Sequence, residues 1–358
     1  MKERKMWKKA FVLGWGLAAV LWLGGCGDRK PDCYRWADTA MGTVIRQSLY
    51  AESGEHAEEL FREISGIVEK LEQETFSWRC EESELSALNR SAGEERGYLL
   101  SGRLTAVLER CRDVWENGGG ALDVTLLPVV QLWNIDAWAA EETEKSYHLP
   151  EAEKLAERRA LCGMERLRLE PEVLEADGET LQDRCFLLAG MQLDLGGVAK
   201  GEALGEIAEY LAREQVEGAV ISLGGSVLTY GQKPDSTKWR VGIADPRNPS
   251  ENLGVLYLEG QWFISTSGDY ERYVEVDGMR YHHIIDPATG MPAASGVRGV
   301  TILARDGFLS DALSTACFIL GTEKGMELAE KYQVQVLFVT DEGELVMSEG
   351  MKTYFRQQ

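Results

Sequence analysis

The sequence is poor in the residues that build several common kinds of site. It has only four histidines in 358 residues, and its seven cysteines form no Cys-x-x-Cys pair and no Cys/His metal-ligand spacing, so a zinc site is not expected. Excess basic charge is also absent, because 59 acidic residues outnumber 38 basic ones and the formal net charge is −21. This balance argues against binding of nucleic acid and against attachment to an anionic membrane through a basic patch.

A hydrophobic run long enough to cross a membrane is missing from the N-terminal region. Residues 10–23 form an uncharged run of 14 residues after a basic start, whereas a membrane span needs ~20. The run ends in Leu23-Gly24-Gly25-Cys26, which has the form of a lipobox. We therefore expect residues 1–25 to be a lipoprotein signal peptide and Cys26 to carry the lipid, with an uncleaved anchor helix as the alternative.

Processing at Cys26 would remove five basic residues and one acidic residue and move the net charge from −21 to −25. The acyl chain would then attach the protein to the extracytoplasmic face of the cell membrane. We expect residues 26–38 to be a tether and residues 39–358 to form one domain. Six cysteines remain, and their even number permits disulfides without requiring them in a chain of this length. They are Cys33, Cys80, Cys111, Cys162, Cys185 and Cys317.

Strands and amphipathic helices alternate along the body of the chain. Apolar residues recur at spacings of three and four in residues 57–71, which predicts a helix with one buried face. Further helices are expected at 83–89, 104–115, 198–213 and 309–320, and strands at 44–50, 191–195, 219–223, 239–243, 262–266, 273–276 and 300–304. This alternation favours a single α/β domain with a mixed or antiparallel sheet and helices between the strands. Residues 136–183 are polar, and we interpret them as a peripheral elaboration.

Residues 281–292 hold the densest group of reactive side chains. Two of the four histidines, His282 and His283, stand there beside Asp286, a Thr-Gly pair and two prolines. A base and a carboxylate among rigid turn residues are typical of a site. An ordinary exit from a strand into a loop is the alternative.

Other candidate residues follow glycine-rich turns. Asp123 comes after three glycines, which suggests a close approach of the backbone to a ligand, although a helix end explains at least one of them. A strand that contains Asp194 turns at Gly196 and Gly197 into a helix with Lys200 in its first turn. Free N–H groups and the dipole of a helix favour an anion at this position, yet no P-loop or dinucleotide fingerprint is present.

Asp311 and Thr315 are one helical turn apart, so their oxygen-bearing side chains project from one face. Hard oxygen ligands of this kind suit Mg²⁺, which also takes phosphate oxygens. Together with Lys200 and His283, the pair favours a pyrophosphate ligand over a bare metal site.

The chain resembles the FAD:protein FMN transferases of the ApbE family. The resemblance rests, in order, on Met41-Gly42-Thr43, residues 83–89, Leu122-Asp123, and residues 194–201, 222–225, 267–272, 283–292 and 311–315. It implies a T-fold-like domain that moves FMN from FAD to a threonine or serine hydroxyl of a target flavoprotein and releases AMP. Members are extracytoplasmic and often lipoproteins.

The resemblance also implies roles for single residues. Mg²⁺ would be held by the Gly197 carbonyl, Asp311 and Thr315. Apart from the resemblance, the ordinary pKa of histidine favours His283 over a carboxylate as the base for the acceptor hydroxyl, with Asp286 as a possible orienting partner. A hydrogen bond that only fixes the loop is the alternative role of His283. The aromatic segment before Ser83 is one residue longer than usual in the family, so Phe76 and Trp78 compete for the flavin contact. The FAD site would be lined by Met41, Trp78, Leu122, Asp123, Asp194, Lys200 and Ile285.

Two other functions are compatible with the same residues. A Mg²⁺-dependent FAD pyrophosphatase would use water in place of the acceptor and release FMN and AMP, and a non-catalytic lipoprotein would only bind flavin. The resemblance implies an FMN-binding subunit of a membrane redox complex as the acceptor. It does not specify which subunit, and the sequence does not address the oligomeric state.

Overall fold

The computed structural model describes residues 31–135, 138, 147–174 and 181–358. In this part of the chain no helix is both long enough and apolar enough to span a membrane. The expected signal peptide, Cys26 and the first residues of the expected tether lie outside the described residues. The described residues beyond Lys30 form one compact unit.

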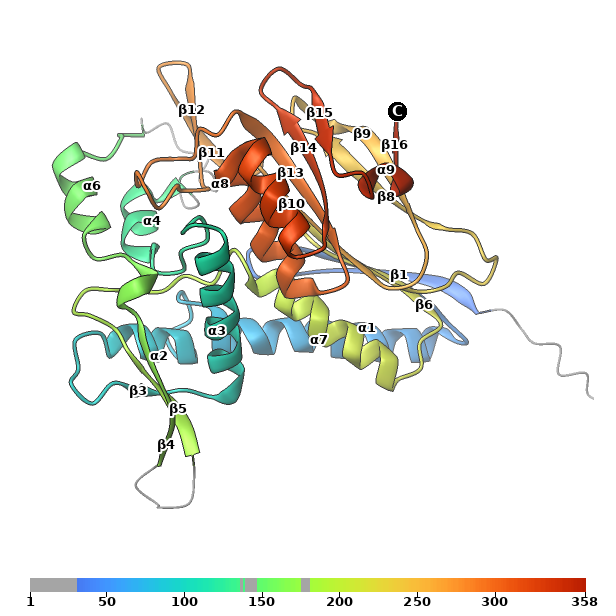
Figure 1. Ribbon diagram of the computed structural model, residues 1–358. Helices are drawn as coiled ribbons and strands as arrows, with labels where there is room; N and C mark the ends of the chain where they lie inside the picture. Colours follow the sequence, from blue (N-terminus) through green and yellow to red (C-terminus); the bar gives the residue numbers. More distant parts are fainter. Residues whose placement is uncertain (1–30, 136–137, 139–146, 175–180) are drawn as a thin grey trace, which may run out of the picture. The chain divides into compact units, whose positions relative to one another are not determined.

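An antiparallel sheet of eight strands forms the centre of this unit (Figure 1). Its order is β1-β2-β6-β7-β10-β13-β14-β15, and every neighbouring pair is antiparallel. The mixed α/β class that the sequence predicts is therefore confirmed, with the antiparallel form of the sheet. The strands are β1 (Asp32–Ala40), β2 (Thr43–Ala51), β6 (Gly218–Leu223), β7 (Ser226–Gly231), β10 (Trp262–Gly268), β13 (Val297–Ala304), β14 (Gln335–Thr340) and β15 (Leu345–Met347).

Helices cover one face of the central sheet, and a small second sheet covers the other. Successive residues of a strand point to opposite faces, so Phe263 of β10 packs among the helices while Ile264 packs against the small sheet. That sheet has the order β16-β9-β8, formed by β16 (Phe355–Gln357), β9 (Asn248–Leu258) and β8 (Trp239–Asp245). The helices of the first layer are α1 (Gly54–Lys70), α3 (Gly102–Asn117), α7 (Ala199–Arg213) and α8 (Gly307–Lys331).

Shorter elements complete the described chain. A separate hairpin pairs β11 (Tyr273–Val276) with β12 (Met279–His282), and a third sheet has the order β3-β5-β4. Helices α4 and α6 lie close to each other in Figure 1. The remaining elements are β3 (Tyr98–Leu99), β4 (Arg168–Leu174), β5 (Leu181–Phe186), η1 (Leu71–Phe76), α2 (Glu84–Arg90), α4 (Leu127–Trp133), α6 (Ala152–Arg159), η2 (Met164–Arg166) and α9 (Met351–Tyr354).

The structure corrects two expectations about these elements. Residues 32–38, expected as part of a tether, belong to β1, because all of β1 pairs in register with β2 from Asp32–Ala51 to Ala40–Thr43. The strand expected at residues 191–195 forms only one isolated bridge, between Gln192 and Leu126. In both cases the deciding contact comes from another part of the chain.

Candidate active site

A cavity of about 640 Å³ lies where the turns of the central sheet meet the ends of α7 and α8. Every residue that the sequence analysis assigned to the FAD and metal sites lines it, and so does His283. The structure thus brings together segments that are up to 274 residues apart, from Met41 to Thr315. These residues are Met41, Trp78, Leu122, Asp123, Asp194, Gly197, Lys200, His283, Ile285, Asp311 and Thr315.

Asp311 is the buried carboxylate of this cavity. One carboxylate oxygen accepts the backbone N–H of Gly201 at 2.9 Å, and the other accepts the hydroxyl of Ser226 at 3.1 Å. The ammonium of Lys200 lies 3.4 Å from the second oxygen. Val198, at the start of α7, makes no side-chain cap. The first turn of α7 needs an acceptor for its N–H groups, and Asp311 of α8 supplies one.

This arrangement changes the expectation for the start of α7. The N–H groups expected to be free for an anion are mostly used inside the protein, because Ala199 donates to Leu195 and Gly201 donates to Asp311. An anionic ligand here would therefore meet the Lys200 side chain. The ammonium keeps part of its surface exposed.

The three proposed metal ligands lie close to one another. The Thr315 hydroxyl is one turn after Asp311 on α8, and a Cβ added to Gly197 would lie 3.5 Å from the Thr315 oxygen. A carboxylate, a hydroxyl and a backbone carbonyl are hard donors that fit Mg²⁺ when phosphate oxygens or water complete its shell. No group of three or more His, Cys, Asp or Glu side chains with metal-binding geometry exists in the described chain, so the site does not resemble a closed transition-metal site.

The two adjacent histidines have different environments. The Nε2 of His282 donates to the Ala293 carbonyl at 3.0 Å, its Nδ1 accepts the Ile284 N–H at 3.3 Å, and its ring packs edge-on against Phe318. Burial lowers its pKa. His282 therefore fixes the loop that follows β12.

His283 faces the cavity instead. Its backbone N–H and its Nδ1 both lie within 3.2 Å of the Arg272 carbonyl oxygen. Because a carbonyl only accepts, Nδ1 carries the proton and Nε2 keeps a lone pair. Burial first, and then the charge of Arg272, lower the pKa of His283 well below its ordinary value, so the ring is neutral at pH 7.

The expectation that Asp286 orients His283 is wrong. Its carboxylate accepts the Ala288 N–H at 2.9 Å and the Thr289 hydroxyl at 3.1 Å. These bonds stabilise the turn after Asp-Pro, which is the usual work of an aspartate at the start of a turn. The Arg272 carbonyl orients His283 in its place.

Asp123 and Asp194 also line the cavity. Asp123 accepts the Thr125 hydroxyl at 2.6 Å and the Met164 N–H at 3.3 Å, and burial raises its pKa. Since the Gly163 N–H also donates to Thr125, part of residues 136–183 supports the site directly and is not only peripheral. The Asp194 carboxylate accepts the Gly196 N–H at 2.8 Å and so shapes the turn that leads to Gly197.

The aromatic alternative is resolved by burial. Phe76 is buried in the core, whereas Trp78 lines the cavity. The indole N–H of Trp78 is buried and has no hydrogen-bond partner among the described residues. A buried N–H that faces a cavity can donate to a ligand bound there, which fits a flat polar ligand such as a flavin.

Met41 is held in place by the turn between β1 and β2. Met41 and Gly42 both have positive φ, at 50° and 65°, as a two-residue hairpin turn requires. The Met41 N–H donates to Glu72 at 2.8 Å.

Glu271 was not selected from the sequence, although it stands in the motif 267–272. It lines the cavity, and its carboxylate oxygen lies 2.7 Å from the position that a Cβ on Gly225 would take. Burial raises its pKa, while Lys200 and Arg272 oppose this rise. A single carboxylate in a loop gives no periodic signal, and its neighbours Gly225 and Lys200 come from the turn before β7 and from α7.

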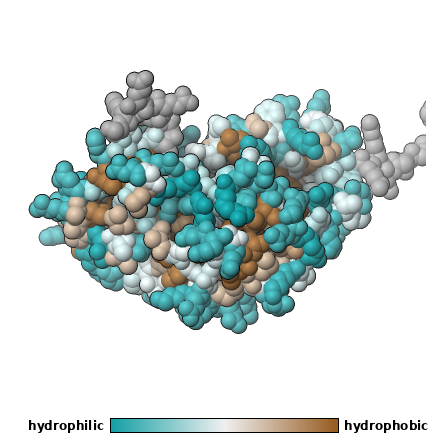
Figure 2. All heavy atoms as spheres, turned by 90° about the horizontal axis from the view of Figure 1, so that it is seen from above, coloured by the Kyte–Doolittle hydropathy of each residue, from teal (hydrophilic) through white to brown (hydrophobic). Residues whose placement is uncertain are grey.

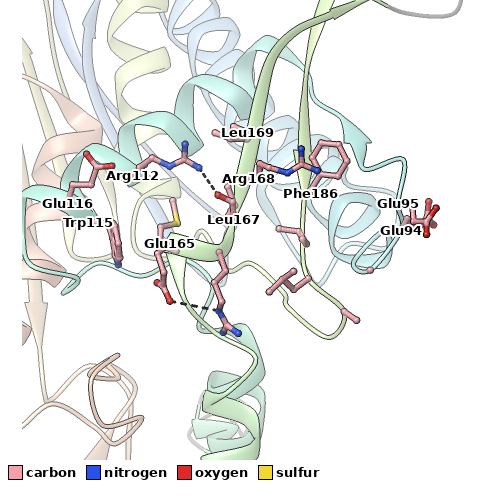
Figure 3. A pocket seen from close by; sticks show the side chains of 16 residues that line it. Glu94, Glu95, Arg112, Trp115, Glu116, Glu165, Leu167, Arg168, Leu169 and Phe186 are labelled. Atoms are coloured by element: carbon pink, nitrogen blue, oxygen red, sulfur yellow. Dashed lines mark hydrogen bonds and ion pairs between the residues drawn. The ribbon is translucent and has the colours of Figure 1, made fainter.

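A wider, open hollow of about 1020 Å³ lies beside α3 and the β4–β5 sheet (Figure 3). Arg112 points to the Leu167 carbonyl, which it contacts at 2.9 Å, and Arg168 lies over the ring of Phe186. None of the predicted site residues lines this hollow. Its arginines contact protein groups, so it has the character of a surface groove.

Comparison with known proteins identifies the family of this chain. The model of the ApbE family matches residues 41–338. A FAD:protein FMN transferase of Vibrio cholerae is 32% identical over 332 residues, which cover 91% of this chain and 93% of that protein. Another from Treponema pallidum is 33% identical over 341 residues, covering 92% and 91%.

Solved structures show the same relationship. An ApbE protein of Thermotoga maritima superposes with a TM-score of 0.76 and 27% identity, covering 91% of this chain and all of the other. The flavin transferase ApbE of Vibrio cholerae gives a TM-score of 0.75 and 28% identity, covering 90% and 99%. With the family match spanning most of the chain, this protein belongs to the ApbE family.

Proposed function

We propose that this protein transfers FMN from FAD to a threonine or serine hydroxyl of an extracytoplasmic flavoprotein, with Mg²⁺ as cofactor. The observation that carries the proposal is the meeting, in one cavity, of Lys200, the Asp311–Thr315 pair and the neutral ring of His283. Relatives over nearly the whole chain are FAD:protein FMN transferases.

The reaction is a phosphoryl-type transfer. The acceptor oxygen forms a bond to the phosphorus of FMN, the bond from that phosphorus to the bridging oxygen breaks, and the electron pair leaves with AMP. A metal ion on Gly197, Asp311 and Thr315 would neutralise negative charge on the pyrophosphate. The proton of the hydroxyl must go to a base.

Lys200 supports the departure of AMP. Its ammonium extends from the first turn of α7 and lies within 3.4 Å of the Asp311 carboxylate. A fixed cation in a partly closed cavity stabilises charge on the leaving group more than water does, because it needs no reorganisation. Asp311 therefore has a second task, which is to hold Lys200 toward the cavity.

His283 is placed to take the proton. Its Nδ1–H donates to the Arg272 carbonyl, so Nε2 is the atom available to the acceptor hydroxyl. The lowered pKa keeps this nitrogen unprotonated at neutral pH. A permanently charged imidazolium could not accept a proton.

The best single test is mass spectrometry of extracytoplasmic membrane proteins with the gene present and deleted. A threonine or serine that gains the mass of FMN only when the gene is present identifies the acceptor, which we expect to be an FMN-binding subunit of a membrane redox complex. The same samples test the lipid on Cys26. Absence of any gene-dependent FMN adduct would contradict the proposal.

Incubation of the purified protein with FAD and Mg²⁺, with and without the acceptor, separates the rival functions. Rapid AMP release without acceptor would favour a pyrophosphatase, and flavin binding without AMP release would favour a binding protein.

Two variants then divide the roles within the site. We expect Asp311→Ala to abolish both transfer and AMP release, because it removes a metal ligand and the partner of Lys200. We expect His283→Ala to slow transfer by about a hundredfold or more while FAD still binds. Near-normal transfer by His283→Ala would show that another group is the base.

A further inference from the structure

The β11–β12 hairpin has one apolar and one polar face. Its cross-strand pairs are Tyr273–His282, Val274–Tyr281, Glu275–Arg280 and Val276–Met279. Because paired residues and residues two apart share a face, one face holds Val274, Val276, Met279 and Tyr281. The turn at Asp277 and Gly278 has positive φ at both positions, as the favoured two-residue hairpin turn requires.

The polar face is satisfied within the protein. Arg280 lies over the ring of Tyr273 and is 3.7 Å from both Glu275 and Asp269. His282 is buried and makes the loop contacts described above. This face thus needs no further partner.

The inner half of the apolar face is covered. Val274 is buried in a cluster with Val129 and Trp133 of α4, and the ring of Tyr281 stacks on Trp133 at 5.8 Å. Trp133 and Ile285 of the same cluster also line the catalytic cavity. The apolar face is therefore a continuation of the cavity wall.

The outer half is only partly covered by the described residues, since Val276 is half-buried and Met279 is exposed. Met279 is 62% exposed, more than any other large apolar side chain of the described residues. On the side from which Figure 2 is drawn, the surface is mostly hydrophilic with a few separate hydrophobic patches. Among the described residues the hairpin pairs with no other strand (Figure 1), and Met279 directly follows its two-residue turn.

Both ends of the hairpin enter the catalytic cavity. Arg272 directly precedes β11 and His283 directly follows β12, and both line the cavity. An acceptor segment that brings its hydroxyl to His283 can therefore extend along the hairpin. From His283 to Met279 the strand spans four residues, or roughly 13 Å.

We propose that the apolar outer face of the β11–β12 hairpin, Val276 and Met279, docks the acceptor protein through an apolar side chain about four residues from the modified hydroxyl. This inference rests on the proposed function. A second copy of the chain fits less well, because two side chains expose far less than the roughly 800 Å² per partner of a stable interface. The strongly negative net charge favours an acceptor segment that is apolar or basic at the contact.

The test uses the full chain with a purified FMN-acceptor domain of a membrane redox complex that the wild-type protein labels. Met279→Asp and Val276→Asp are compared with Leu188→Asp, because Leu188 is 49% exposed and lines the separate hollow of Figure 3. We expect the two hairpin variants to lower kcat/KM for the acceptor about tenfold through KM. Leu188→Asp should leave kcat/KM for the acceptor unchanged, and Met279→Leu should keep most of the wild-type kcat/KM.

Binding of FAD and the maximal rate at saturating acceptor are measured on the same variants. Both should stay within about twofold of wild type, since Met279 is not among the residues that line the cavity. Equal acceptor KM for Met279→Asp and Leu188→Asp would overturn the docking proposal while leaving the function intact. Loss of FAD binding by Met279→Asp would also overturn the docking proposal. So would a wild-type dimer that dissociates in Met279→Asp but not in the other variants. If the wild-type protein labels no acceptor, the proposed function and the docking proposal both fail.

Discussion

Replacement of Gly201 by alanine should break the crossing of α7 and α8. A Cβ on Gly201 would lie 2.1 Å from the carbonyl oxygen of Gly307 and 2.7 Å from the Cβ of Asp311. Gly307 is equally restricted, because a Cβ there would lie 2.2 Å from the carbonyl oxygen of Gly201. The two backbones touch at this point, and no flexible side chain can move aside.

The expected destabilisation follows from these distances. The helices must separate by about 1 Å to admit a methyl group, and overpacking of this kind costs about 1 to 3 kcal/mol. The separation also weakens the hydrogen bond from the Gly201 N–H to Asp311, and a bond to a charged group contributes about 1.5 to 3 kcal/mol. After the gain in helix propensity, of about 1 kcal/mol, we expect the free energy of unfolding to fall by about 3 kcal/mol.

Gly205→Ala is the matched control. Gly205 lies one turn later on α7, and no atom lies within 4 Å of the position that its Cβ would take. The same substitution should raise the free energy of unfolding by up to about 1 kcal/mol. Urea unfolding followed by tryptophan fluorescence measures both variants.

AMP release completes the test, because the crossing also positions Asp311 and Lys200. Gly201→Ala should lose most of its activity under conditions where it is still folded, whereas Gly205→Ala should keep it. A Gly201→Ala variant whose free energy of unfolding and activity both match those of Gly205→Ala would refute the close contact.

The remaining predictions concern His283 and Trp78. The pKa of His283 is lowered in the folded protein. The transfer rate should therefore stay level as the pH falls from 8 to about 6.5, the ordinary pKa of histidine, and decrease only below that pH. A pH–rate profile that already falls above pH 7 would contradict a neutral base. For the same reason the folded state binds a proton at His283 less readily than the unfolded state does. The contribution of His283 to the free energy of unfolding is complete above the unfolded pKa and declines as the pH falls below about 6.5. Thermal unfolding at several pH values measures this decline. Trp78→Phe removes an N–H that has no partner among the described residues, together with part of a ring that packs against the core. The free energy of unfolding should therefore fall by about 1 kcal/mol, while FAD affinity falls about fivefold, as flavin fluorescence would show. Unchanged affinity would mean that the indole N–H does not reach the ligand.

Lys200, Asp311 and Thr315 could be selected from the sequence because each lies in a local pattern, whereas Met41 and Ile285 were expected from the family resemblance. Lys200 follows a Gly-Gly turn at the start of an amphipathic helix, and Asp311 and Thr315 are spaced by one helical turn. Such patterns depend on neighbours in the chain, and the order of the motifs indicated the family. The structure places every one of these residues at one cavity.

Three features depended on pairings between segments that the local sequence does not specify. β1 is a strand because β2 pairs with it, and Asp311 caps α7 because Gly201 and Gly307 let the two helices touch. His283 is oriented by the Arg272 carbonyl across the hairpin.

The sequence by itself determined the amphipathic faces of the helices, the family and the set of candidate residues, because these follow from the order and spacing of side chains. Only the tertiary structure decided which histidine faces the cavity, which aromatic residue is core and what Asp286 does. These questions depend on burial and on hydrogen-bond partners, which the order of side chains does not specify: His282 and His283 bond to carbonyls 11 residues away, and Asp286 bonds within its own turn.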